Sequence, residues 1–131
     1  MPYILDADWI INALAGREPA VSTIKRLAPA QIAVSIITVG EVLEGAFGSA
    51  NPEARLALYH EFLHPFHLIG VNEAIIEKFA EIRAYLRRTR QIISDFDILL
   101  GATALHHDLT VLTFNRRHLA RIDGLRVYQA P

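Results

Sequence analysis

The sequence predicts one α/β domain, spanning residues 1–131, with a largely parallel sheet of four to five strands that helices cover on both faces. The first observation is that short apolar runs, several of them β-branched, alternate with segments of helical pattern. The second is that 52% of the 131 residues are hydrophobic, which suffices for one buried core. The third is an even composition, with no repeat or linker to mark a boundary.

The first expected elements are a strand and two helices. Residues 3–5 are a short apolar run, which predicts a buried strand, and the polar segment 6–8 ends it. Residues 9–15 predict a helix that ends at Gly16, and residues 21–27 predict a second helix.

A second strand and two more helices follow. Residues 32–36 are rich in β-branched side chains and predict a strand. Thr38 then opens a helix that runs to about Phe47. Asn51, followed by proline at the first helical position, is a strong start signal for a helix over 52–63.

The second half continues the alternation with a strand at 66–71 and a long helix capped by Asn72. Spacings of 4, 3 and 4 residues place its apolar side chains on one helical face: Ile75, Phe79, Ile82 and Leu86. The remaining expected elements are a helix from Ser94 or Asp95 to Leu105, a strand at 109–113, a short helix at 116–121 and a last strand at 125–128.

Four polar side chains should meet at one edge of this sheet. Asp6 and Asn115 follow predicted strands, Glu41 lies one turn into the helix after the second strand, and Asp97 opens the helix that leads into the fourth strand. In parallel sheets, ligands bind beyond the carboxyl ends of the strands. Hard oxygen ligands without Cys favour Mg²⁺ or Mn²⁺ over zinc, and such a cation activates water and screens charge on a phosphodiester.

Each acid also has a purely structural interpretation. Thr38-x-x-Glu41 has the pattern of a capping box, in which the glutamate only reaches back to its own helix start, and Ser94-x-x-Asp97 imitates that pattern. Asp8 can serve as an N-cap, and the amide after the fourth strand can serve a turn. The convergence of four separate segments favours a functional site.

Four segments resemble the motifs of PIN-domain ribonucleases, in particular the VapC-type toxins of bacterial toxin–antitoxin pairs. They cover nearly the whole chain in the family's order: residues 3–11 (YILDADWII), 36–45 (IITVGEVLEG), 97–105 (DILLGATAL) and 109–115 (LTVLTFN). The resemblance implies a three-layer α/β/α sandwich with a Mg²⁺- or Mn²⁺-dependent endoribonuclease site. It also implies an RNA substrate, a homodimer and a cognate antitoxin that blocks the site.

Carried over residue by residue, the resemblance assigns the metal-site carboxylates to Asp6, Glu41 and Asp97. The family's fourth acidic position falls on Asn115, where Asn also occurs, and Thr113 matches a supporting hydroxyl. Because Asn115 supplies no charge, we expect one metal ion rather than two.

Three positions depart from the family pattern. Asp8 stands where Asn is frequent and adds a possible ligand, and Arg90 stands in a loop where Gly is common. Asp95 precedes Asp97 by two residues and competes with it for the same role. We prefer Asp97 because the apolar helix follows it directly.

Two groups of arginines are candidates for RNA contacts, because phosphate contacts position a nucleic acid. They are Arg83, Arg87, Arg88 and Arg90 in one run, and Arg116, Arg117 and Arg121 after the fourth strand. The structural alternative is a solvated helix end whose charges suit the helix dipole.

A competing motif is His60-Glu61-x-x-His64, the H-E-x-x-H pattern of zinc metalloproteases. Pro65 ends the helix at the second histidine, and no third histidine follows at the expected spacing. A further alternative is a non-catalytic RNA- or protein-binding module of the same fold, which Asn115 keeps open.

The composition excludes other classes of protein. The net charge of −1 argues against a strongly basic nucleic-acid binder. The absence of Cys excludes disulfides and thiolate metal sites, and it fits a reducing compartment. No apolar run approaches the roughly 18 residues of a membrane span, and the N-terminal segment has no basic leader. We therefore expect a cytoplasmic protein without membrane contact.

Overall fold

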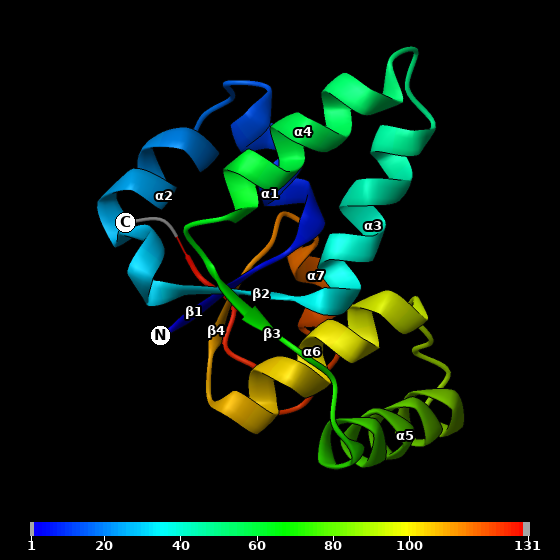
Figure 1. The fold of residues 1–131 in the computed structure, drawn as a ribbon. Coiled ribbons are helices and arrows are strands. Elements are labelled where there is room, and N and C mark those ends of the chain that lie inside the picture. The colour runs from blue at the N-terminus through cyan, green and yellow to red at the C-terminus, as the bar shows by residue number, and fades with distance from the viewer. Residues whose placement is uncertain (1, 130–131) are drawn as a thin grey trace.

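Four parallel strands form the centre of the computed structural model, which describes residues 2–129 (Figure 1). The strands stand in the order β3-β2-β1-β4, so the first strand lies between the second and the last. Their bounds are β1 (Tyr3–Leu5), β2 (Ile32–Ser35), β3 (His67–Ile69) and β4 (Thr110–Leu112). All three pairings are parallel, which confirms the expected type of sheet.

The expected strand at 125–128 is reduced to a single parallel bridge between Val111 and Val127. Val111 donates its N–H to the carbonyl of Arg126 at 2.9 Å and accepts from the N–H of Tyr128 at 2.8 Å. Since β4 has only three residues and its other edge pairs with β1, it offers the C-terminal segment little ladder to extend.

Helices cover both faces of the sheet. In Figure 1, α1, α2 and α4 lie above the sheet and α5 and α6 lie below it. The bounds are α1 (Ala7–Leu14), α2 (Ala20–Leu27), the 3-10 turn η1 (Pro29–Gln31), α3 (Ile36–Phe47), α4 (Pro52–Leu63), α5 (Glu73–Arg88), α6 (Asp95–His107) and α7 (Arg116–Leu119). This is the expected three-layer α/β/α sandwich.

Alternation along β1 divides the core between the two faces. Leu5 packs with Trp9 and Ile10 of α1, whereas Ile4 packs with Leu100 and Ala104 of α6. All six side chains are almost completely buried, so both layers of helices are held on the sheet by apolar contact.

The predicted starts of two helices were wrong. Helix α3 begins at Ile36 rather than at Thr38, because Ser35 ends β2 in an extended conformation and its Oγ accepts the N–H of Ile37 at 3.1 Å. Helix α1 begins at Ala7, and its N-cap is Asp6 rather than Asp8. The capping-box interpretation of Glu41 therefore fails, since Thr38 already lies inside the helix.

Three other helix starts agree with the sequence. Asn51, Asn72 and Ser94 each accept a main-chain N–H in the first turn, at 3.3, 2.9 and 3.2 Å. Between residues 2 and 129, none of the helices combines the length and the apolarity that crossing a membrane requires.

Candidate active site

The carboxyl edge of the sheet brings together side chains from five segments. Asp6 directly follows β1, Asp8 lies in the first turn of α1, and Glu41 lies in α3. Asp97 lies in the first turn of α6, and Asn115 comes three residues after the end of β4. Because β1 and β4 are parallel neighbours, the residues that follow them lie side by side.

The segment after β4 holds three of these carboxylates, one for each of its residues. Thr113 donates its hydroxyl to Oδ2 of Asp6 at 2.7 Å. The main-chain N–H of residue 114 donates to Oδ2 of Asp8 at 3.0 Å. Asn115 donates its Nδ2 to Oδ2 of Asp97 at 2.9 Å. Residues 113–115, which we call the β4 frame, therefore orient three acids: the one that follows β1, one in α1 and one in α6.

The start of α6 lacks the contact that would complete a capping box, in which the side chain of Asp97 would bond back to the main chain of Ser94. Ser94 does cap the main chain there, but the side chain of Asp97 is bonded to Asn115. Asn115 itself makes no capping hydrogen bond to α7. Neither side chain therefore makes the capping contact that the sequence allowed at its helix start.

Sequence reasoning missed His118, which the structure places beside this pair. Nδ1 of His118 lies 3.1 Å from Nδ2 of Asn115 and 3.9 Å from Oδ2 of Asp97. The spacing of three residues from Asn115, across the start of a short helix, is the signal that would have indicated this neighbour.

The acids in this site repel one another and are poorly solvated. Burial raises the pKa of Asp8 to about 7, with repulsion from Asp6 as the next cause. Burial also raises the pKa of Glu41 to about 7, assisted by repulsion from Asp6 and then Asp97. The pKa of Asp6 is raised by burial too, although the Thr113 hydroxyl and the Ala7 N–H oppose this rise.

Asp6, Asp8, Glu41 and Asp97 suit a hard divalent cation. Oδ1 of Asp8 is buried and has no hydrogen-bond partner within the described chain, and a cation would supply the missing contact. No set of three or more His, Cys, Asp or Glu side chains in residues 2–129 is gathered closely enough to hold a bare ion. Mg²⁺ usually keeps several waters and takes only one or two carboxylates directly, so the donor set fits a hydrated ion.

Asp95 lies outside this group of acids. Its Oδ1 accepts a hydrogen bond from Nε of Arg83 on α5 at 2.8 Å, and both side chains are exposed. Asp95 is also absent from the charges that raise the pKa values of Asp6, Asp8 and Glu41.

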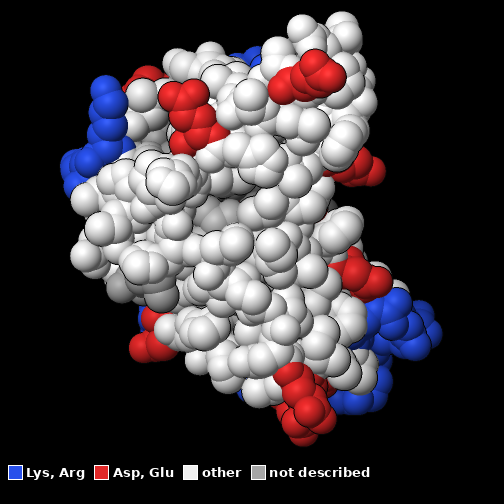
Figure 2. Space-filling view, viewed as in Figure 1, with Lys and Arg blue, Asp and Glu red and all other residues white. Residues whose placement is uncertain are grey.

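The basic run lies where α5 ends, next to the start of α6. Figure 2 shows Lys and Arg side chains gathered at this edge of the molecule, with acidic side chains close by. Arg83 bridges the two helices through Asp95, whereas Arg87, Arg88 and Arg90 are exposed. The run therefore lies on the last turns of α5 and just beyond its end. Helix α5 packs against α6, and α6 carries Asp97.

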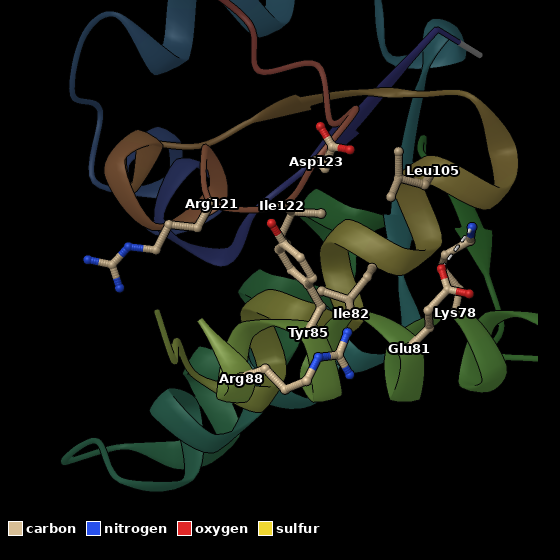
Figure 3. Close-up of a pocket in the computed structure, with 9 residues that line it drawn as sticks. All are labelled: Lys78, Glu81, Ile82, Tyr85, Arg88, Leu105, Arg121, Ile122 and Asp123. Atoms are coloured by element: carbon tan, nitrogen blue, oxygen red, sulfur yellow. Dashed lines mark ion pairs between the residues drawn. The ribbon is translucent and has the colours of Figure 1, made fainter. Parts of the chain in front are cut away.

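A separate cavity of about 380 Å³ lies on the α5 side of the molecule (Figure 3). Arg88 borders it, with its guanidinium 5.9 Å from the centre of the Tyr85 ring. Charges of both signs line the cavity, and none of the acids at the carboxyl edge of the sheet belongs to it.

The H-E-x-x-H motif does not form a metal site in the described part of the chain. Helix α4 ends at Leu63, so His64 already lies outside the regular helix. His60, Glu61 and His64 are all exposed, and residues 2–129 provide no third ligand to complete a set. The structure thus offers no support for the zinc protease alternative.

The chain is similar to proteins of known family. Residues 3–125 match the family model described as PIN domain. The chain is 26% identical over 126 residues to "tRNA(fMet)-specific endonuclease VapC" of Shigella flexneri, covering 96% of each chain. It is 31% identical over 101 residues to "Ribonuclease VapC4" of Mycobacterium tuberculosis, covering 75% of this chain and 77% of the relative.

A solved structure shares the whole fold. The structure "DNA bound VapBC from Salmonella typhimurium" superimposes with a TM-score of 0.91 at 25% identity, covering 98% of this chain and 97% of that one. The resemblance inferred from the four sequence motifs is therefore confirmed.

Proposed function

The chain belongs to the PIN domain family, and from this premise we propose that it is an endoribonuclease and the toxin of a toxin–antitoxin pair. The curated relatives are ribonucleases by name, and they align over nearly the whole chain. The observation that carries the proposal is the β4 frame, which holds acids from three other elements at one edge of the sheet.

We assign metal binding to Asp6, Glu41 and Asp97, with Asp8 as a further oxygen donor. Mg²⁺ or Mn²⁺ is the cation that this all-oxygen set suits. When bound, such an ion would activate water and screen charge on the phosphodiester. The unpartnered Oδ1 of Asp8 and the raised pKa values of Asp8 and Glu41 support the assignment, because a cation relieves both conditions.

The remaining residues position the acids and the RNA. Thr113 orients Asp6 through its hydroxyl, and Asn115 orients Asp97 through its side-chain amide. Arg116 is exposed directly after the β4 frame and can contact an RNA phosphate, which counteracts repulsion between the RNA and the acids. We assign the same role, contact with RNA phosphates, to the arginines at the end of α5.

We propose three further properties from the family. The protein acts in the cytoplasm, it forms a homodimer, and a cognate antitoxin protein inhibits it. The similar structure from Salmonella typhimurium is a VapBC assembly bound to DNA, which supports the proposed antitoxin partner.

Cleavage of a mixed panel of structured RNAs tests the activity and the site together. The purified protein is incubated with Mg²⁺, with Mn²⁺ or with EDTA, and wild type is compared with Asp97→Asn and Asp95→Asn. We expect cleavage by wild type and by Asp95→Asn, and no cleavage by Asp97→Asn or in EDTA. The two aspartates lie two residues apart on one helix, so Asp95→Asn is a closely matched control.

Each other outcome has a distinct meaning. Loss of cleavage in Asp95→Asn but not in Asp97→Asn would move the metal site to Asp95. Cleavage that persists in EDTA would exclude the divalent cation. A folded, antitoxin-free wild type that cleaves no RNA in the panel would favour the non-catalytic binding module.

A further inference from the structure

An exposed aromatic ring lies directly beside the acids. Phe114 is the middle residue of the β4 frame, and its main-chain N–H is bonded to Asp8. Its ring stacks on the indole of Trp9, with ring centres 4.9 Å apart and planes inclined by 12°. Trp9 is only 2% exposed, whereas Phe114 is 43% exposed.

The position of this ring is fixed from two directions. The residues on either side of Phe114 are bonded to carboxylates, and its own N–H is bonded to a third, so the main chain is held. The buried indole supports one face of the ring. The exposed area must therefore lie on the opposite face and the edge, where a second flat group can stack.

Burial does not explain this ring. At 43% exposure, a large apolar side chain stabilises the fold much less than it would if it were fully buried. The charges around it also disfavour an acidic or purely apolar protein partner, because residues 113–115 are bonded to three carboxylates and exposed arginines follow them. A nucleotide suits both the ring and the charges beside it. Its base can stack on the ring, and its phosphate can bind a cation held by the acids or an arginine.

We propose that Phe114 is a stacking platform for the nucleobase next to the phosphodiester that the acidic site cleaves. The proposal rests on the proposed ribonuclease function and specifies its substrate as RNA with an unpaired base at the cleavage point. A base inside a duplex already stacks on both neighbours, so it must be unpaired or turned outward to reach Phe114. Stacking accepts all four bases, because every base has a π-face.

Arg116 and Arg117 complete the platform electrostatically. Both are exposed, and neither forms an ion pair within the residues that the structure describes. They follow Phe114 by two and three residues, so a strand stacked on the ring can place its next phosphates against them.

The first experiment measures stacking without cleavage. Short single-stranded RNAs carry the fluorescent base 2-aminopurine at one position each and are titrated with protein in EDTA. We expect wild type and Phe114→Trp to quench the fluorescence of at least one RNA, and Phe114→Leu to quench none. Phe47→Leu is the control, because Phe47, the last residue of α3, is an aromatic that is even more exposed than Phe114.

The second experiment uses the RNA that the wild type cleaves. Loss of one base–aromatic stack weakens binding by about 5- to 150-fold, so we expect KM to rise by that factor in Phe114→Leu with little change in kcat. Phe114→Trp should keep the wild-type KM, and so should Phe47→Leu. A duplex form of the same RNA should be cleaved poorly by every variant.

The outcomes separate this inference from the proposed function. Wild-type KM and quenching in a folded Phe114→Leu would overturn the platform while leaving the ribonuclease intact, as would equal cleavage of duplex and single-stranded RNA. Absence of any cleavage by wild type would refute the ribonuclease, and the quenching test in EDTA would then decide on the platform alone. If Phe114→Leu does not fold, loss of quenching in Phe114→Trp overturns the proposal.

Discussion

Replacing Glu41 by Gln should stabilise the metal-free protein at alkaline pH, although it removes a predicted metal ligand. The pKa of Glu41 rises from 4.5 to about 7 in the folded protein, first because of burial and then because of repulsion from Asp6, Asp97 and Asp8. Between pH 4.5 and about pH 7 the folded state binds more protons than the unfolded chain, so the free energy of unfolding falls as the pH rises. Gln does not titrate and avoids this loss.

The size of the effect follows from the same values. At about 1.4 kcal/mol for each pKa unit, a rise from 4.5 to about 7 corresponds to about 3 kcal/mol. Glu41 is only partly buried, so solvent screening reduces this figure, and we expect about 1–2 kcal/mol. For a domain of 131 residues, that difference raises Tm by about 5 °C.

Thermal unfolding of wild type, Glu41→Gln and the control Glu61→Gln, in EDTA and in Mn²⁺, tests this reasoning. In EDTA, Glu41→Gln should match wild type near pH 4.5, diverge as the pH rises and exceed it fully above about pH 7. In Mn²⁺ the order should reverse, because only wild type gains the full stabilisation by a bound ion. Glu61 is exposed on α4, so its replacement should change neither curve. A Glu41→Gln variant that is less stable than wild type at about pH 8 in EDTA would refute the reasoning.

Three further changes have expected results. Gly101→Ala should lower the free energy of unfolding by about 1 kcal/mol in urea denaturation, because its Cβ would stand 2.5 Å from the buried Ile122 side chain. Gly40→Ala should raise the free energy of unfolding by about 0.5–1 kcal/mol, because nothing lies within 4 Å of the added Cβ. Equal shifts in the two variants would contradict the packing around residue 101. Thr113→Val removes the hydroxyl that holds the acid after β1, and calorimetric titration should show Mn²⁺ affinity about 10- to 100-fold lower; an unchanged affinity would argue against that supporting role. Asn115→Asp adds a fifth carboxylate to Asp6, Asp8, Glu41 and Asp97, so it should tighten Mn²⁺ binding but lower Tm in EDTA. A higher Tm in EDTA would count against repulsion among the acids.

Most of the fold could be predicted from the sequence because its signals are local. The apolar run of β1 and the Asn–Pro start of α4 place those elements within a residue of where they lie. The start of α3 could not be placed, because both Ser35 and Thr38 are good caps and only the length of β2 decides between them. The single bridge at Val127 depends on how many main-chain groups of β4 are left to pair with the C-terminal segment, and only the assembled sheet determines that number.

The candidate site was partly predictable for a related reason. The rule that parallel strands end at one edge brings Asp6 and Asn115 together without any side-chain detail. The choice between Asp95 and Asp97 depends on direction, because residues two apart on a helix do not share a face. The role of Phe114 depends on its contact with Trp9, which is 105 positions away in the sequence, and no local pattern indicates it.

The place of β1 between β2 and β4 also sets the order in which the protein can mature during translation. The first strand to leave the ribosome pairs along one edge with the last, through Tyr3↔Thr110 and Leu5↔Leu112. At roughly 5–20 residues per second, several seconds of synthesis separate the two strands. During that interval the acid after β1 has no β4 frame to orient it, so the proposed nuclease site cannot form. A ribosome that stalls before residue 110 would release a chain with an open strand edge, prone to aggregate but unable to cut RNA.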